Sequence, residues 1–348
     1  MSKNAMAGAV TLCGVGLCVI GGALVMQNGS QANADCVVIP FDSAIVTWAP
    51  PRPAKSVPSP NPPTTPPTQA SDTFPKVDRD GPAVVLKLHG TVGCSFEDAN
   101  FFTASDFKTA LARAEKLKAS VIVLDIKSGG GRVDTKEEIV REILSATARG
   151  QRVVALVRDA GSAAALIALA CPEILVLPAA RIGAAVSITT TDSGMMSLKK
   201  ALEADPEIAA KFTSYANAMD LEAARANNRS TAISTAMKEM SAELWWSPTT
   251  GFSETEASDD SVCYDDKTHI LTLTFSQVKE TGLGVGVMRD EDVWGTLGYS
   301  APPKKVDLSS SLKKTPLRVA ALMKQVRNGN YAILFKKSKE FESLLNDP

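Results

Sequence analysis

The middle of the chain alternates between two patterns of hydrophobic and polar positions. Short runs rich in β-branched residues predict strands, and runs with an apolar residue every three or four positions predict helices. The predicted strands cover residues 83–89, 120–127, 152–157 and 173–177, and the predicted helices cover 104–118 and 135–148, with a third that opens at Ser162. Strands that alternate with helices form a mostly parallel sheet with helices on both faces. This α/β architecture is the fold class we expect.

Beyond residue 200 the pattern predicts a long helix over 206–225 with one apolar stripe, formed by Ile208, Phe212, Tyr215 and Met219. The other elements predicted here are a short helix at 237–246, a hairpin over 261–275, a helix at 277–282 and a strand at 284–288. After residue 300 the chain becomes polar. We expect two amphipathic helices in a solvated tail, at 317–326 and 331–345, with contact to a membrane surface as the alternative.

The first 34 residues have the pattern of a signal sequence or a membrane anchor. Residues 5–26 contain no charged side chain, and Lys3 precedes them. Ala32, Asn33 and Ala34 match a cleavage site, which favours removal, whereas the length of the apolar run favours retention as an anchor. The positive flank stays inside, so both interpretations place the rest of the chain on the extracytoplasmic side, membrane-anchored or secreted.

Composition divides the remainder of the chain. Residues 35–80 form a linker in which half of the positions from 50 to 67 are proline, so it acts as an extended spacer, with a recognition motif as the alternative. We expect the main folded domain at 81–300 and a polar C-terminal tail at 301–348. A formal net charge of −1 gives no general attraction to nucleic acid, and we expect no such partner.

The six cysteines lack the spacing of a zinc site, and we expect neither a metal nor a cofactor. Cys171 ends an apolar helical pattern, so we expect it in the core. A disulfide between Cys36 and Cys94, or between Cys94 and Cys263, is compatible with a place outside the cytoplasm. The sequence does not choose between these two pairings.

One hydroxyl, that of Ser162, stands among the small apolar residues of RDAGSAAALIALAC, directly after a glycine. Two interpretations fit it: an N-cap that opens a buried helix, or a nucleophile placed where backbone N–H groups hold an oxyanion. One βα unit earlier a glycine triplet follows a predicted strand, for which an ordinary turn and a phosphate site are the alternatives. Neighbouring loops of a parallel sheet share an edge, so we expect one oxyanion site beside the serine, with one donor from Gly130 or Gly131 and another from Ala163.

A serine nucleophile needs a proton acceptor. The chain has only two histidines: His89 ends a predicted strand, and His269 lies in the predicted hairpin, where we expect it to be exposed. Lys211 is the better candidate, because it lies on or beside the apolar stripe of its helix. An enclosed lysine becomes a neutral amine that accepts the serine proton, whereas a lysine that extends into water has no such role.

Several of these segments together resemble one family. GGGRVDTKEEIVREI and GSAAALIALACPEILVLPAARIGAA are similar to serine proteases of the Clp-protease/crotonase fold, and above all to the membrane-bound Ser–Lys branch with NfeD-type proteases and signal peptide peptidase A. PAARIGAA resembles the turn that lines their substrate groove. KFTSYANAMDLEAARANNR resembles the segment with their general base, which implies that role for Lys211 and a structural cation at Arg229. The likeness covers about residues 83–300, from VVLKLHGTVG to ILTLTFSQVKETGLGVGV and slightly beyond.

The resemblance implies a serine endopeptidase, membrane-anchored or exported, that cleaves peptide or protein substrates by acyl transfer and forms a homo-oligomer. Two segments depart from the family pattern: Ser128 stands where a proline is frequent, and Ala163 and Ala164 stand where a glycine follows soon after the serine. The stretch between Ala185 and Lys211 is also long. A catalytically inactive scaffold that binds a protein partner, or an acyl-CoA enzyme of the crotonase type, are the alternative functions.

Overall fold

The computed structural model describes residues 80–95, 100–191 and 194–327, together with four short strands before residue 41. Those strands pair in order as an antiparallel sheet: β1 (Ala7–Leu12), β2 (Val15–Ile20), β3 (Ala23–Gln27) and β4 (Val37–Pro40). Most of the predicted linker and the helix expected at 331–345 lie outside the described residues. Among the helices that the structure describes, none has the length and apolar character to span a membrane.

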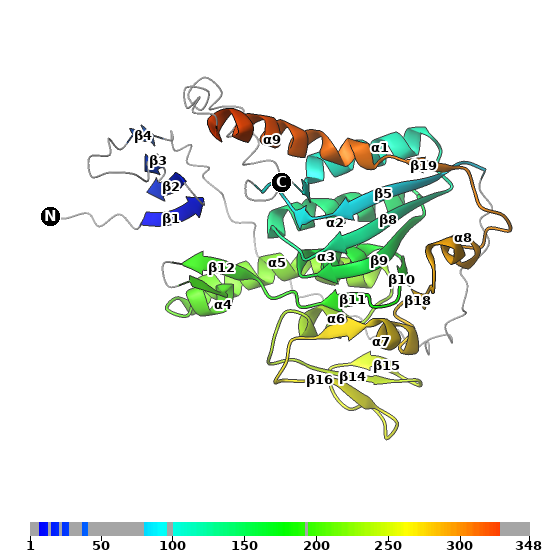
Figure 1. Cartoon of the computed structure of the whole chain (residues 1–348). Helices are drawn as coiled ribbons and strands as arrows, with labels where there is room; N and C mark the ends of the chain where they lie inside the picture. Colours follow the sequence, from blue (N-terminus) through cyan, green and yellow to red (C-terminus); the bar gives the residue numbers. More distant parts are fainter. Residues whose placement is uncertain are drawn as a thin grey trace. The chain divides into compact units, whose positions relative to one another are not determined.

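A mostly parallel sheet forms the centre of the main unit (Figure 1). Its unbranched part runs in the order β19 (Lys305–Asp307), β5 (Ala83–His89), β8 (Val121–Ser128) and β9 (Val153–Gly161). The sheet then forks, because two strands share β9: β10 (Glu173–Val176) pairs with its first half and β11 (Arg181–Gly183) with its last residues. The two branches end in β18 (Val285–Gly286), which is parallel to β10, and β17 (Thr272–Thr274), which is antiparallel to β11. The expected fold class is confirmed.

Alternate side chains of the strands point to two different cores. On one face Ile122, Leu124 and Ile126 are buried in the larger core, under α1 (Ala104–Lys116), α2 (Val133–Ala148) and α3 (Ala163–Ala170). On the other face Val121 and Val123 belong to a smaller core, which includes the short helix α8 (Val293–Thr296). A strand that is buried on both faces has to be almost continuously apolar. The apolar run at 120–127 therefore predicts a strand.

Two of the expected elements after residue 230 are wrong. In place of a helix at 237–246 the structure has α6 (Thr231–Ala236) followed by the strand β14 (Glu243–Ser247), and the expected hairpin over 261–275 does not form. Its first half, β16 (Val262–Asp266), pairs with β14 beside β15 (Gly251–Ser253), and its second half is β17, which joins the central sheet. Aromatic packing explains the first error, because Tyr264 contacts both Trp246 and Phe252 edge-on across these strands.

The described residues beyond 300 belong to the fold rather than to a solvated tail. β19 pairs with β5, and Leu312, in the 3₁₀ turn η2 (Ser309–Lys313), is fully buried. α9 (Lys314–Arg327), close to the expected 317–326, buries Val319 and Leu322. The N–H of Thr315 donates to the buried Asp106 carboxylate of α1 at 2.8 Å. These contacts join segments that are far apart in the sequence, so the local pattern of hydrophobic and polar residues does not predict them.

The remaining elements are the 21-residue helix α5 (Pro206–Ala226) and several short ones. Within the main unit the short ones are β6 (Thr91–Val92), β7 (Phe101–Phe102), α7 (Phe275–Glu280) and η1 (Asp290–Asp292). A second compact unit contains the hairpin of β12 (Ile188–Thr191) and β13 (Gly194–Ser197), followed by α4 (Leu198–Ala201).

Candidate active site

Ser162 occupies the sharp turn between β9 and α3. Its backbone has φ 52° and ψ −125°, a conformation that residues other than glycine rarely adopt and that costs about 1–3 kcal/mol. The Ser162 N–H donates to the carbonyl of Gly183 at 2.8 Å, which holds the turn in place. Ser162 is the N-cap residue of α3 by position, as one of the two interpretations expected, but its side chain makes no capping hydrogen bond to the helix. The half-buried hydroxyl is therefore left for another role.

The glycine loop, which consists of Gly129, Gly130 and Gly131 between β8 and α2, lies directly against this turn. Gly130 has φ +104°, and a Cβ added to it would lie 2.5 Å from the Ser162 Cβ and 2.9 Å from the Gly161 carbonyl oxygen. On its other side the loop is held by Val92, whose N–H donates to the Gly130 carbonyl at 2.9 Å and whose carbonyl accepts from Arg132 at 2.8 Å. Parallel topology thus brings the two loops together, as the sequence predicted.

The three backbone N–H groups considered as oxyanion donors differ in whether they already have a hydrogen-bond acceptor. The N–H of Ala163 belongs to the first turn of α3, where backbone donors have no partner within the helix. The Gly130 N–H donates to the Ser128 Oγ at 3.1 Å and is engaged. Within the described part of the chain, the N–H groups of Gly131 and Ala163 have no hydrogen-bond acceptor. Two donors are therefore open, and the third would have to leave Ser128.

Lys211 lies on the first half of α5 and is exposed to solvent. The stripe around it is exposed as well: Ile208, Phe212 and Tyr215 are 42%, 52% and 68% exposed. The buried residues of α5, Asp220, Ala223 and Ala224, all lie in its second half. The structure therefore brings Ser162 and the glycine loop together, but leaves Lys211 in water.

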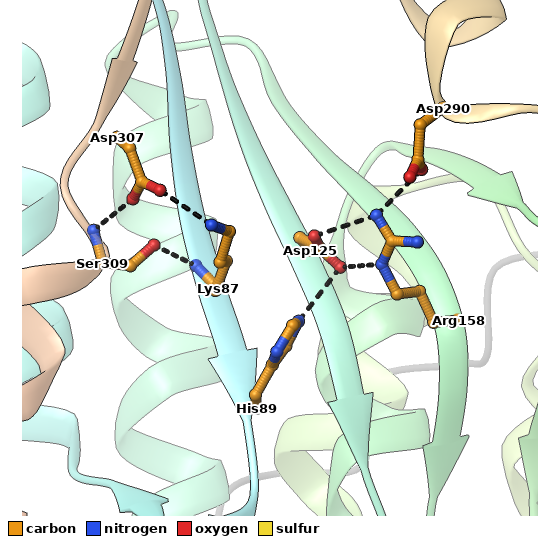
Figure 2. Close-up of polar contacts among 7 residues, drawn as sticks. All are labelled: Lys87, His89, Asp125, Arg158, Asp290, Asp307 and Ser309. Carbon is orange, nitrogen blue, oxygen red and sulfur yellow. Dashed lines mark hydrogen bonds and ion pairs between the residues drawn. The ribbon is translucent and has the colours of Figure 1, made fainter.

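Neither histidine serves the serine in this structure. The Nε2 of His89 lies 3.2 Å from Asp125 Oδ1, on the face of the sheet shown in Figure 2. Arg158 also contacts Asp125, at 2.7 Å, and reaches Asp290 at 2.8 Å (Figure 2). His269 is 76% exposed and contacts Asp266 in its own turn. Burial alone would raise the pKa of Asp125, but hydrogen bonds from His89 and Arg158 hold it below its ordinary value.

Arg229 has a structural role at the far end of α3. Its guanidinium donates to the carbonyls of Leu169, Cys171 and Pro172 at 2.6, 2.6 and 2.9 Å, where the last carbonyls of a helix lack partners. Burial lowers the pKa of Arg229 to about 10. The side chain completes the C-terminus of the serine helix, in keeping with the structural cation that the resemblance implied.

Among the described cysteines, Cys171 is buried as expected and Cys263 is an exposed free thiol. The disulfide between Cys94 and Cys263 is therefore not formed. Burial raises the pKa of the Cys171 thiol to about 12, so this thiol stays protonated and unreactive. Cys36 lies outside the described residues.

Sequence reasoning missed a buried charged cluster formed by Lys136 of α2, Asp220 of α5 and Lys238. The two ammonium groups lie 2.8 and 3.1 Å from the two carboxylate oxygens of Asp220, and the side chains are 3%, 3% and 9% exposed in that order. Lys238 also donates to Asn217 Oδ1 at 2.8 Å. One signal was present: Lys136 stands three residues before the buried Ile139, on the apolar side of its helix.

The cluster predicts a pH dependence of stability. Burial lowers the pKa of Lys238, and the attraction of Asp220 offsets this only in part. Between its folded and unfolded pKa values the unfolded chain binds a proton that the folded chain lacks. The free energy of unfolding therefore rises with pH in this window, by at most about 1.4 kcal/mol per pH unit.

Urea unfolding at a series of pH values from about 7 to about 10 measures this rise. We expect it to be weaker in Lys238→Met than in the unmodified chain, and unchanged in Lys200→Met, which removes an exposed lysine. Identical pH profiles for the unmodified chain and Lys238→Met would contradict the prediction.

Comparison with known proteins identifies the family. The sequence matches the family model of the NfeD1b N-terminal domain over residues 103–300, and no curated protein matches it. Two solved structures similar to the chain are mutants of the 1510-N membrane-bound stomatin-specific protease. One has 17% identity and a TM-score of 0.45 and covers 66% of this chain and 98% of the other. The second, in complex with a substrate peptide, has 18% identity and a TM-score of 0.47 and covers 69% of this chain and 98% of the other.

A third similar structure is ClpP1 from Listeria monocytogenes, with 15% identity, a TM-score of 0.36, and 60% of this chain and 94% of the other covered. At such identities a likeness concerns the fold and not the activity. The family match is the stronger finding, and it confirms the NfeD-type resemblance of the sequence. Since the matched region exceeds half of the 348 residues, the chain belongs to the NfeD1b N-terminal domain family.

Proposed function

We propose that the protein is a serine peptidase of the Ser–Lys type. The observation that carries this proposal is the Ser162 turn. A strained backbone presents a hydroxyl that is not used for capping, and the backbone of the glycine loop lies against it. Residues other than glycine in such conformations concentrate at functional sites, because the surrounding structure has to maintain the strain. Sharp strand-to-helix turns also present the nucleophile in other hydrolases.

In the proposed reaction Ser162 Oγ attacks the peptide carbonyl carbon while Lys211 takes the hydroxyl proton. The N–H groups of Ala163 and Gly131 stabilise the oxyanion, joined by that of Gly130 once it leaves Ser128. The C–N bond then breaks, Lys211 gives the proton to the leaving amine, and water hydrolyses the acyl-enzyme. The reaction requires neither a metal nor a cofactor.

Lys211 can take this role only when water is excluded from its amine. A bound peptide that lies along Ile208, Phe212 and Tyr215 would bury these side chains and shield the lysine between them. We further propose that the chain is anchored to a membrane or exported through residues 1–34, with this domain on the extracytoplasmic side, and that it forms a homo-oligomer.

A catalytically inactive scaffold is the second candidate, and two observations favour it: Lys211 is exposed, and the Gly130 N–H is engaged with Ser128. Such a scaffold would bind a protein partner without cleaving it. Incubation with an acylating probe separates the two functions, because only the peptidase becomes modified at Ser162.

Variants at Lys211 test the proposed base. Both Lys211→Ala and Lys211→Arg should lower kcat for peptide cleavage by roughly 10² to 10⁴-fold, because arginine keeps the charge but cannot give up its proton. Lys200→Ala should cleave like the unmodified chain. Substantial activity in Lys211→Arg would show that a cation is sufficient and that another group is the base.

A further inference from the structure

The buried cluster of Lys136, Asp220 and Lys238 joins three parts of the proposed site. Lys136 lies in the first turns of α2, five residues after Gly131 of the glycine loop. Asp220 lies on α5, the helix that carries Lys211 on its exposed half. Lys238 follows Met237, whose carbonyl accepts a hydrogen bond from the N–H of Ala185 at 2.6 Å. Ala185 belongs to the segment that resembles the substrate-groove turn.

We propose that Asp220 is a positioning residue for the proposed peptidase reaction. Through Lys136 it fixes α5, the helix of the proposed general base, against α2, the helix that follows the glycine loop. Through Lys238 it fixes the same helix against the turn after α6, which Met237 joins to Ala185 beside the proposed substrate groove. This inference rests on the proposed function, because it assigns Asp220 a part in that reaction.

The composition of the cluster supports a geometric role. Buried ions lose their hydration, and apolar side chains of similar size are often as stabilising or more so, so stability alone does not explain two lysines and one aspartate here. The two ammonium groups contact different oxygens of Asp220, at 2.8 and 3.1 Å. Because these contacts are directional, they restrict the position of α5 relative to its neighbours more than apolar packing does. Asn217, one turn before Asp220, adds a second contact to Lys238.

Two single variants separate the two connections. Lys136→Met and Lys238→Met each remove one amine and leave Asp220 with one lysine, so both retain a balanced buried ion pair. Lys136→Met cuts the connection between the base helix and the oxyanion loop, and we expect kcat to fall roughly 10 to 100-fold with little change in KM. Lys238→Met keeps the contact between Lys136 and Asp220 but removes the contact between α5 and the turn after α6, beside the proposed substrate groove. We therefore expect mainly a higher KM.

Asp220→Asn removes both ion pairs at once and should lower kcat at least as much as Lys136→Met. Asp125→Asn is the matched control, because Asp125 is also a buried carboxylate with two basic partners, but lies on the other face of the sheet (Figure 2). Its kcat should stay within about threefold of the unmodified chain, since α5 and the glycine loop keep their contacts.

Hydrogen exchange of the full chain gives a readout that does not depend on activity. Lys136→Met should speed exchange in the second half of α5 and the start of α2, and Asp125→Asn should not. Equal kcat and KM changes in the two methionine variants, or unchanged exchange in α5, would overturn the inference while leaving the peptidase intact. If the unmodified chain cleaves no peptide, or if Ser162→Ala cleaves equally well, the proposed function fails, and with it the catalytic role of Asp220.

Discussion

Replacement of Ser162 by alanine is expected to reduce kcat for peptide cleavage about 10⁴-fold or more, because the acyl-enzyme can no longer form. The loss should appear in kcat rather than in KM, since the groove and the backbone donors remain. Residual turnover of roughly 10³-fold over the uncatalysed reaction would come from those donors and from substrate binding. The same variant should lose all modification by an acylating probe at this position.

Two control variants complete this test. Ser214→Ala removes an exposed hydroxyl from α5 and should leave both cleavage and labelling unchanged. Ser162→Gly should be as inactive as Ser162→Ala. Its free energy of unfolding should exceed that of Ser162→Ala by about 1 kcal/mol, because glycine adopts φ 52° and ψ −125° without strain. Cleavage by Ser162→Ala at the rate of the unmodified chain would exclude the proposed nucleophile, and failure of Ser162→Gly to raise the melting temperature would argue against strain at the turn.

Gly130→Ala should damage the site almost as severely without removing any group that reacts. The new Cβ would lie 2.5 Å from the Ser162 Cβ and 3.0 Å from the Ala163 nitrogen, so the serine turn has to move. The backbone at φ +104° adds a conformational cost of about 1–3 kcal/mol. A displacement of the nucleophile by about 1 Å is enough to lower kcat roughly 10²-fold. Activity and thermal unfolding measure the two effects.

The neighbouring glycine provides the control for this substitution. A Cβ added to Gly129 meets no atom within 4 Å, and its φ lies outside the region that excludes other residues. Gly129→Ala should therefore leave kcat unchanged and raise the free energy of unfolding by up to about 1 kcal/mol, through the lower entropy of its unfolded chain. Equal activity in Gly129→Ala and Gly130→Ala would mean that the glycine loop does not position the serine.

Much of the main sheet was decided by local sequence. The strand expected at 83–89 is β5 residue for residue, and the expected helix at 135–148 differs from α2 by two residues at its start. Continuous apolar runs and three-to-four-residue spacing determine these elements, because burial on both faces of a sheet or on one face of a helix leaves few alternatives. The meeting of Gly130 and Ser162 was also readable, since parallel topology brings successive βα loops to one edge.

The tertiary structure alone decided the features that depend on distant partners. Residues 243–247 are a strand because Tyr264 and its neighbours pair with them, and residues 305–307 join the sheet because the edge of β5 is open to them. Asp220 is charged and buried because two lysines, from residues 84 positions before it and 18 after it, meet its carboxylate. Lys211 is exposed because the buried residues of α5 all lie in the second half of the helix. Local sequence fixes what each segment prefers, whereas burial and charge pairing depend on which segments meet.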